Sequence, residues 1–166
     1  MNPTEVRIAA LLLQGLHLGG FNVSEELGVL SPYRTQVAAL KAALSTHPSH
    51  TATASARRER VGLGTRALES NPAAGTPEIS TVDTYQGRDK ECLIISFVRS
   101  SDASGALGEL LRDWRRVNVA LTRARHKLII IASARTLARI PFLNGLVQHA
   151  RSCGWVVPLP TGAVTD

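Results

Sequence analysis

The run Cys92-Leu-Ile-Ile-Ser-Phe-Val98 is the strongest indication of the fold of this chain, because it is apolar along almost its whole length. Strands of this kind are buried on both faces, which is typical of parallel sheets covered by helices on each side. A second run, Leu128-Ile-Ile-Ile-Ala132, has the same character. Shorter strands are expected at 27–30 and 79–82. The sequence therefore predicts a buried parallel sheet.

Helical patterns separate these strands. Asn2 and Pro3 suit the start of a first helix, which glycines further along bring to an end. Apolar residues at helical spacing predict further helices over 35–44, 110–125, 134–140 and 142–151, and the segment 155–157 suits a last edge strand. Strands that alternate with helices indicate an α/β fold, a parallel sheet flanked by helices.

The length of 166 residues favours one domain, expected over residues 1–160 and followed by a short tail at 161–166. The stretch 45–77 is rich in small and polar residues and almost free of large apolar ones. Such a composition is unable to bury enough surface to order itself, so we expect a flexible insertion there.

The net charge of +6 favours an anionic partner, either nucleic acid, a nucleotide or a membrane surface. Almost all of this excess lies between Arg112 and Lys127, where six basic residues stand against one acid. No stretch approaches the roughly 20 apolar residues of a membrane helix, and no signal peptide is recognisable, so we expect a soluble intracellular protein that does not contact a membrane. The two cysteines and five histidines show no ligand spacing, so no metal site is expected.

Three segments carry many hydrogen-bond donors that suit an oxyanion-rich partner. They are Gly28-Val-Leu-Ser-Pro-Tyr-Arg-Thr-Gln36, Ser80-Thr-Val-Asp-Thr-Tyr-Gln-Gly-Arg-Asp-Lys90 and Arg115-Arg-Val-Asn-Val-Ala-Leu-Thr-Arg-Ala-Arg125. In this order they resemble motifs IV, V and VI of superfamily 1 helicases of the Upf1-like group, and within it the eukaryotic DNA helicase/nucleases. The resemblance is loose over 1–44 and close over 78–160. It implies a RecA-like second helicase lobe.

The resemblance also implies roles for single residues on the nucleotide side. Arg123 matches the arginine finger, a catalytic group that stabilises charge on the transferring phosphoryl group. Gln86, Gly87 and Asp89 match the turn that borders the nucleotide, although the family more often has glutamate at the last position. Arg34 is expected to reach phosphate or solvent.

Other residues are expected to contact single-stranded or flap DNA: Ser31, Pro32, Tyr33, Thr81 and Arg99. In parallel sheets, ligands bind at the carboxyl ends of the strands. We therefore expect this set and the stretch 83–89 to share one rim. The alternatives are an ordinary strand-to-helix turn at 31–33 and structural roles for Thr81 and Arg99. Trp114 is expected to pack in the core rather than to stack on a base, and Arg115 and Arg116 to form salt bridges or contact the stretch 80–90.

No phosphate-binding loop of the form G-x-x-x-x-G-K-[ST] occurs in the sequence. The resemblance therefore implies that ATP and Mg²⁺ are held mainly by a first RecA-like lobe, with this chain as a fragment of a larger enzyme and inactive alone. The nuclease and any iron–sulfur cluster would belong to that parent. The resemblance further implies 5′–3′ movement, roles in Okazaki-fragment maturation and DNA repair, and a place in the nucleus and also the mitochondrion. An RNA helicase lobe and a non-catalytic binding module are the alternatives.

Overall fold

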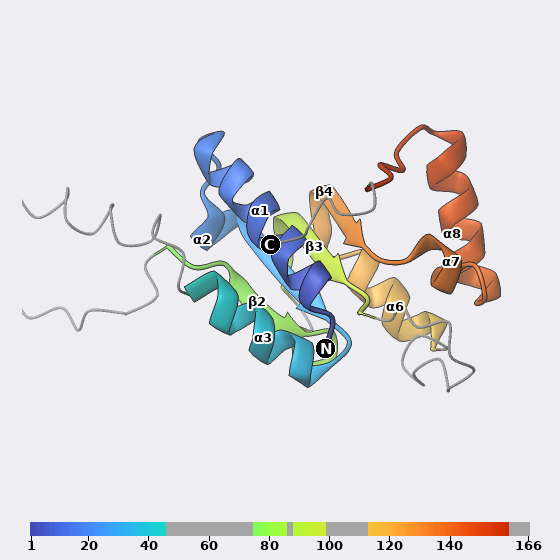
Figure 1. Ribbon diagram of the computed structural model, residues 1–166, viewed down its shortest axis with the longest axis horizontal. Coiled ribbons are helices and arrows are strands. Elements are labelled where there is room, and N and C mark those ends of the chain that lie inside the picture. The colour runs from blue at the N-terminus through green and yellow to red at the C-terminus, as the bar shows by residue number, and fades with distance from the viewer. Residues whose placement is uncertain (46–74, 86–87, 99–112, 160–166) are drawn as a thin grey trace, which may run out of the picture.

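A four-stranded parallel sheet forms the centre of the protein in the computed structural model, which describes residues 1–45, 75–85, 88–98 and 113–159 (Figure 1). The strands stand in the order β2 (Glu78–Thr81), β1 (Leu27–Ser31), β3 (Lys90–Ser96) and β4 (Ala124–Ile131). All three neighbouring pairs are parallel. The predicted fold class, a parallel sheet with flanking helices, is confirmed.

Helices cover both faces of the sheet (Figure 1). On one face lie α1 (Pro3–Leu18) and α3 (Arg34–Ser45), with the short α2 (Val23–Glu26) at the end of α1. On the other lie α6 (Trp114–Leu121), α7 (Ala134–Leu137) and α8 (Pro141–Ser152). Successive residues of β3 point to opposite faces, and Leu93, Ile94 and Ile95 are each 0% exposed. The apolar run that begins at Cys92 therefore forms a strand buried on both faces, as predicted.

The first helix begins as its sequence predicts. The Asn2 side chain accepts a hydrogen bond from the backbone N–H of Glu5 at 3.3 Å, and Pro3 occupies the first helical position. Gly19 is the residue after the last turn. Gly15 does not interrupt the helix, because one glycine costs only about 1 kcal/mol in a helix interior.

Two predicted elements differ from the structure. The helix predicted over 110–125 ends at Leu121 within the described residues, because Ala124 already pairs with Lys90 as the first residue of β4. Tertiary pairing with β3 thus overrides the helical spacing of this segment. The edge strand predicted at 155–157 is wrong as well, since these residues form no strand and are exposed.

The connection between β2 and β3 crosses β1, because β1 lies between them in the sheet. It also returns to the opposite edge, because parallel strands are entered at the same end. The 3₁₀ turn η1 (Asp83–Tyr85) begins this crossing. The Tyr85 side chain is 1% exposed and packs with Leu30 and Leu93 on the α6 face. A Cβ atom on Gly28 would lie 2.6 Å from the Tyr85 hydroxyl, so only glycine leaves room for this ring.

The predicted insertion lies mostly outside the described residues. Ser45 ends α3, and residues 75–77 lead directly into β2. The tail at 161–166 also lies outside them. None of the helices in the described ranges has the length and apolar character needed to cross a bilayer.

Candidate functional site

Arg123 occupies the turn between α6 and β4, at the edge where the strands of the sheet begin. Its Nη1 atom donates to the Asp89 carboxylate at 2.9 Å, and its Nε atom donates to the Val119 carbonyl at 3.1 Å. The backbone is held too, because the Lys90 N–H donates to the Arg123 carbonyl at 3.1 Å. The guanidinium is therefore fixed from two sides, while its remaining N–H groups can still bind an anion.

Further ion pairs line the same edge. Arg88 pairs with Glu78, Arg125 lies 3.3 Å from the Glu91 carboxylate, and His126 forms a short contact with the same carboxylate. The hydrogen bond from His126, followed by that from Arg125, lowers the pKa of Glu91. These pairs lie at the surface, where water screens the attraction between the charges. They place both acidic and basic side chains around Arg123 at this edge.

The carboxyl-terminal edge of the sheet carries the residues expected to contact nucleic acid. Ser31 and Thr81 are register partners at the ends of β1 and β2. Ser31 is 0% exposed, and its hydroxyl accepts from the Tyr33 N–H at 3.4 Å, while Pro32 is buried. These contacts fit the alternative of a strand-to-helix turn. Thr81 and Tyr33 are half-buried, and the hydroxyl of Tyr33 is itself buried.

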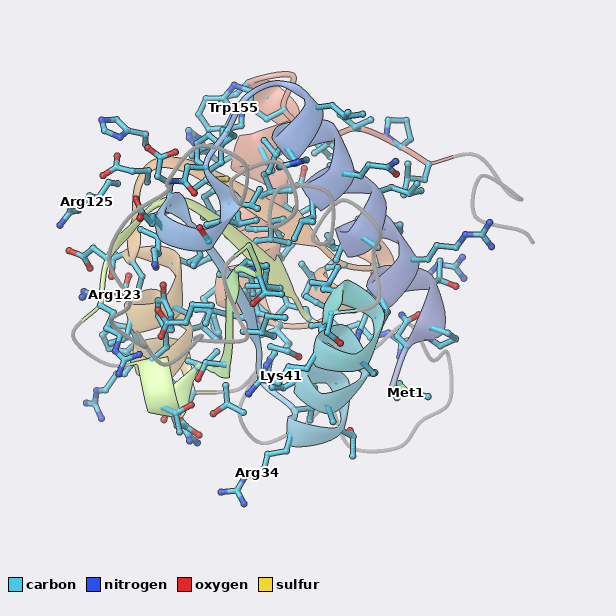
Figure 2. The ribbon with its side chains drawn as sticks, turned by 90° about the vertical axis from the view of Figure 1, so that its left-hand side faces the viewer. Met1, Arg34, Lys41, Arg123, Arg125 and Trp155 are labelled. Carbon is cyan, nitrogen blue, oxygen red and sulfur yellow. The ribbon has the colours of Figure 1, made fainter. Side chains whose placement is uncertain are left out.

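The predicted residues divide between two opposite edges. Arg34 is exposed at the first residue of α3, which follows the carboxyl end of β1, whereas Asp89 and Arg123 precede the first residues of β3 and β4. Figure 2 shows Arg34 projecting away from the region of Arg123. The expectation of one rim for 31–33 and 83–89 is therefore wrong for Asp89. The chain returns to the opposite edge through the crossing at Tyr85. Gln86, Gly87 and Arg99 lie outside the described residues.

A buried polar network beside the end of β3 has no counterpart among the sequence predictions. Glu5 is 4% exposed, and its carboxylate accepts from the Val98 N–H at 2.9 Å and from the Ser96 hydroxyl at 2.5 Å. The fully buried Gln36 donates to Ser96 at 3.1 Å and accepts from the Asn2 N–H at 2.8 Å. Burial raises the pKa of Glu5 in spite of these bonds.

Only part of that network has a signal in the sequence. Asn2 and Glu5 have the spacing of a capping box, which identifies the start of a helix. Their contacts with Gln36 and Ser96 join residues 34 and 91 positions apart, which no local pattern reveals. The network ties α1 and α3 to the segment that leaves β3. Val98 in this segment has φ 71°, an unusual value for a β-branched residue.

The N-terminus of α6 lies near the carboxyl-terminal edge. The guanidinium of Arg116 donates to Asp83 at 2.8 Å, so α6 is attached to the turn that follows β2. This agrees with the expectation of a contact between Arg116 and the stretch 80–90. Trp114, expected in the core, is 56% exposed, because it stands in the first turn of α6 outside the buried stripe of Val117 and Ala120.

The described residues present arginine side chains at both edges of the sheet. No group of three or more His, Cys, Asp or Glu side chains within these ranges is arranged to hold a metal ion. An arginine with spare donors is suited to a phosphate and adds no proton chemistry of its own. The arrangement at Arg123 thus has the chemistry to stabilise negative charge on a phosphoryl group.

Comparison with known proteins places the chain in a family. A family described as "AAA domain" matches residues 1–135. The DNA replication ATP-dependent helicase/nuclease of Mus musculus is 39% identical over 160 residues, which are 96% of this chain and 12% of that protein. The protein of the same name from Xenopus tropicalis is 53% identical over 91 residues, which are 55% of this chain and 9% of that protein.

The similarity extends to yeast. The Saccharomyces cerevisiae protein of the same name is 35% identical over 156 residues, which are 93% of this chain. The chain spans only 8% of that protein's length, so it corresponds to a small part of these relatives. With the family match over most of the chain and the RecA-like α/β architecture, this chain belongs to the AAA-domain family of superfamily 1 helicases.

Proposed function

We propose that this chain is the second motor lobe of an ATP-dependent 5′–3′ DNA helicase/nuclease that acts in DNA replication and repair in the nucleus. The names of its relatives from mouse and yeast support the activity and the role in replication. The order of the three donor-rich segments supports the position of this lobe within the motor. We take residues 1–160 as the lobe and 45–77 as an insertion in it.

The observation that carries this proposal is the fixed guanidinium of Arg123. It is held by Asp89 and by the carbonyl of Val119, and it is 27% exposed in its side chain. A charge held in place in advance costs no reorganisation when negative charge develops opposite it. Arg123 would therefore stabilise the transferring phosphoryl group, as an arginine finger does.

The other half of the site is assigned to a partner lobe. ATP with Mg²⁺, when bound, would supply the phosphoryl group and a cation that offsets its negative charge. This chain has no phosphate-binding loop to cradle it, so Arg123 and the neighbouring Asp89 would act across an interface with a first RecA-like lobe. Any iron–sulfur cluster would likewise be held by the parent enzyme.

Single-stranded or flap DNA would follow the opposite edge of the sheet. There Thr81 and Tyr33 are half-buried, and Arg34, which was expected on the nucleotide side, extends into solvent at this edge. Phosphate contacts of this kind fix the position of a strand without reading its sequence. Separate edges for nucleotide and DNA would allow the lobe to touch both partners at once.

The test is a chimera in which residues 1–160 replace the matching segment of the mouse relative. Arg123→Ala should lower ATP turnover by about 10³–10⁵-fold, the usual worth of an arginine finger, and leave DNA binding largely intact. Arg125→Ala is the matched control, because this arginine lies two positions on and pairs with Glu91 instead. It should change turnover little.

Near-normal ATP turnover in Arg123→Ala would overturn the finger assignment. Unwinding assays on DNA and RNA duplexes with equal overhangs separate the two helicase hypotheses. A chimera that unwinds only RNA would contradict the DNA assignment. A chimera that binds DNA but hydrolyses no ATP, although the mouse parent does, would favour a non-catalytic binding module.

A further inference from the structure

An exposed tryptophan stands at the beginning of α6. Trp114 is 56% exposed, although tryptophan side chains in folded proteins are highly buried on average. The buried residues of α6 are Val117 and Ala120, so the helix packs on the sheet without this ring. The core therefore does not account for a tryptophan at this position.

The position of Trp114 is fixed by two neighbours. The Asp113 side chain caps the helix, accepting from the Arg115 N–H at 3.1 Å, and Arg116 is bonded to Asp83 at 2.8 Å. Asp83 lies two residues after Thr81, the last residue of β2. Trp114 thus lies toward the carboxyl-terminal edge of the sheet, to which we have assigned single-stranded DNA.

Charge around the ring favours a nucleic acid over an apolar partner. The Arg115 guanidinium lies 5.6 Å from the centroid of the Trp114 ring, within the range of a cation–π contact. Among the described residues, Arg115 has no carboxylate within salt-bridge distance. Arg115 is itself exposed, so a phosphate can reach its charge, while the open part of the ring offers a flat apolar surface.

We propose that Trp114 stacks on an unpaired base of the bound strand while Arg115 contacts the adjoining phosphate. This inference rests on the proposed function and names the group that would hold the base. Stacking on an aromatic ring is tolerant of sequence, since every base has a π face. The contact therefore suits a motor that must move along any DNA.

Trp155, the second tryptophan, provides a matched control. It is 70% exposed but already has an edge-to-face contact with His149, with ring centroids 5.7 Å apart. It follows the end of α8 and lies far from Arg34 in Figure 2. The two tryptophans thus have similar exposure at different places on the molecule.

The experiment uses the full chain and its own fluorescence. The sequence contains only two tryptophans, so Trp155→Phe leaves Trp114 as the sole reporter and Trp114→Phe leaves Trp155. Each variant is titrated with oligodeoxythymidine at low salt, and binding is followed in parallel by the anisotropy of a label on the DNA. We expect quenching in Trp155→Phe and none in Trp114→Phe.

Affinity provides an independent measurement. Trp114→Ala should weaken binding of oligodeoxythymidine about 5- to 150-fold, the loss of one stacked base, while Trp155→Ala should not. An abasic strand of equal length keeps the phosphates but lacks the bases, so Trp114→Ala should not change its affinity. Because Trp114 is exposed, thermal unfolding of the variant should match that of the unaltered chain.

The outcomes separate the two proposals. Binding by anisotropy without quenching of Trp114 would overturn the stacking role and leave the proposed function in place. An equal loss of affinity for the normal and the abasic strand would overturn it too, because the effect would not involve a base. No binding of any strand would contradict both.

Discussion

The guanidinium of Arg123 lies 2.9 Å from the carboxylate of Asp89, a residue 34 positions earlier in the chain. Both residues stand directly before a strand, and β3 and β4 are neighbours in the sheet. The pair therefore joins the segments expected to border the nucleotide and to carry the catalytic arginine. Asp89 becomes the residue that positions Arg123.

Asp89→Asn should slow ATP turnover in the chimera about 10- to 100-fold, because a small displacement of a catalytic group is costly. Stability should change by less than about 1 kcal/mol, since the pair is partly exposed. Glu91→Gln is the control, because it removes another acid from the same edge without touching Arg123. Equal turnover in the two variants would show that Asp89 does not position the arginine.

Gly28→Ala should destabilise the protein by about 1–3 kcal/mol, as expected for overpacking in a core. The added Cβ would lie 2.6 Å from the Tyr85 hydroxyl and 2.8 Å from a methyl group of Leu93. Urea unfolding of the single variants and of Gly28→Ala combined with Tyr85→Phe gives the coupling between the sites. The combined variant should recover part of the loss, because the hydroxyl is removed. Strictly additive effects would mean that the ring does not meet the new methyl group.

The stability contributed by Glu5 should depend on pH. Burial raises the pKa of its carboxyl group above the value in the unfolded chain, so the folded protein binds this proton more tightly. Its contribution is complete at acid pH, below the unfolded pKa, and is lost as pH rises through the raised pKa. The free energy of unfolding is measured with urea for Glu5→Gln and for the unaltered chain across this range. As pH rises, the unaltered chain should lose stability relative to the variant. A difference independent of pH would mean that the pKa of Glu5 is the same in the folded and the unfolded chain.

Binding of single-stranded DNA should weaken steeply with added salt, because basic residues displace counterions from the phosphates. Removal of one phosphate contact by Arg115→Gln should reduce the slope of log K against log salt by about 0.7. Arg151→Gln, at the exposed end of α8, is the control and should leave the slope unchanged. An affinity that does not change with salt would mean that basic residues of the chain do not contact the phosphates of the strand.

Much of the fold follows from local pattern. Apolar runs at 92–98 and 128–132 identify buried strands, because a strand with apolar side chains on both faces is buried only in a sheet that is covered on both faces. Asn2 and Pro3 identify the start of a helix, since both act within one turn. The donor-rich segments carry their resemblance in the order of their residues, so the family is predictable from the sequence alone.

Element boundaries and exposure depend on contacts between distant residues. Helical spacing predicts Arg123 within a helix, but pairing of Ala124 with Lys90 converts this segment into a turn and a strand. Trp114 is expected in the core from its sequence, and its exposure depends on how α6 packs on the sheet. The bonds of Glu5 with Ser96 cross 91 positions and have no local signal.

The α/β class, the parallel sheet and the segments that bear the chemistry can thus be predicted from the order of the residues. That Arg34 and Thr81 lie at one edge while Asp89 and Arg123 lie at the other follows only from the arrangement of the strands in space. The reason is the direction of the chain: parallel strands must all be entered at the same end, so each connection returns across the sheet. Residues that directly follow a strand and residues that directly precede one are thereby separated by its length.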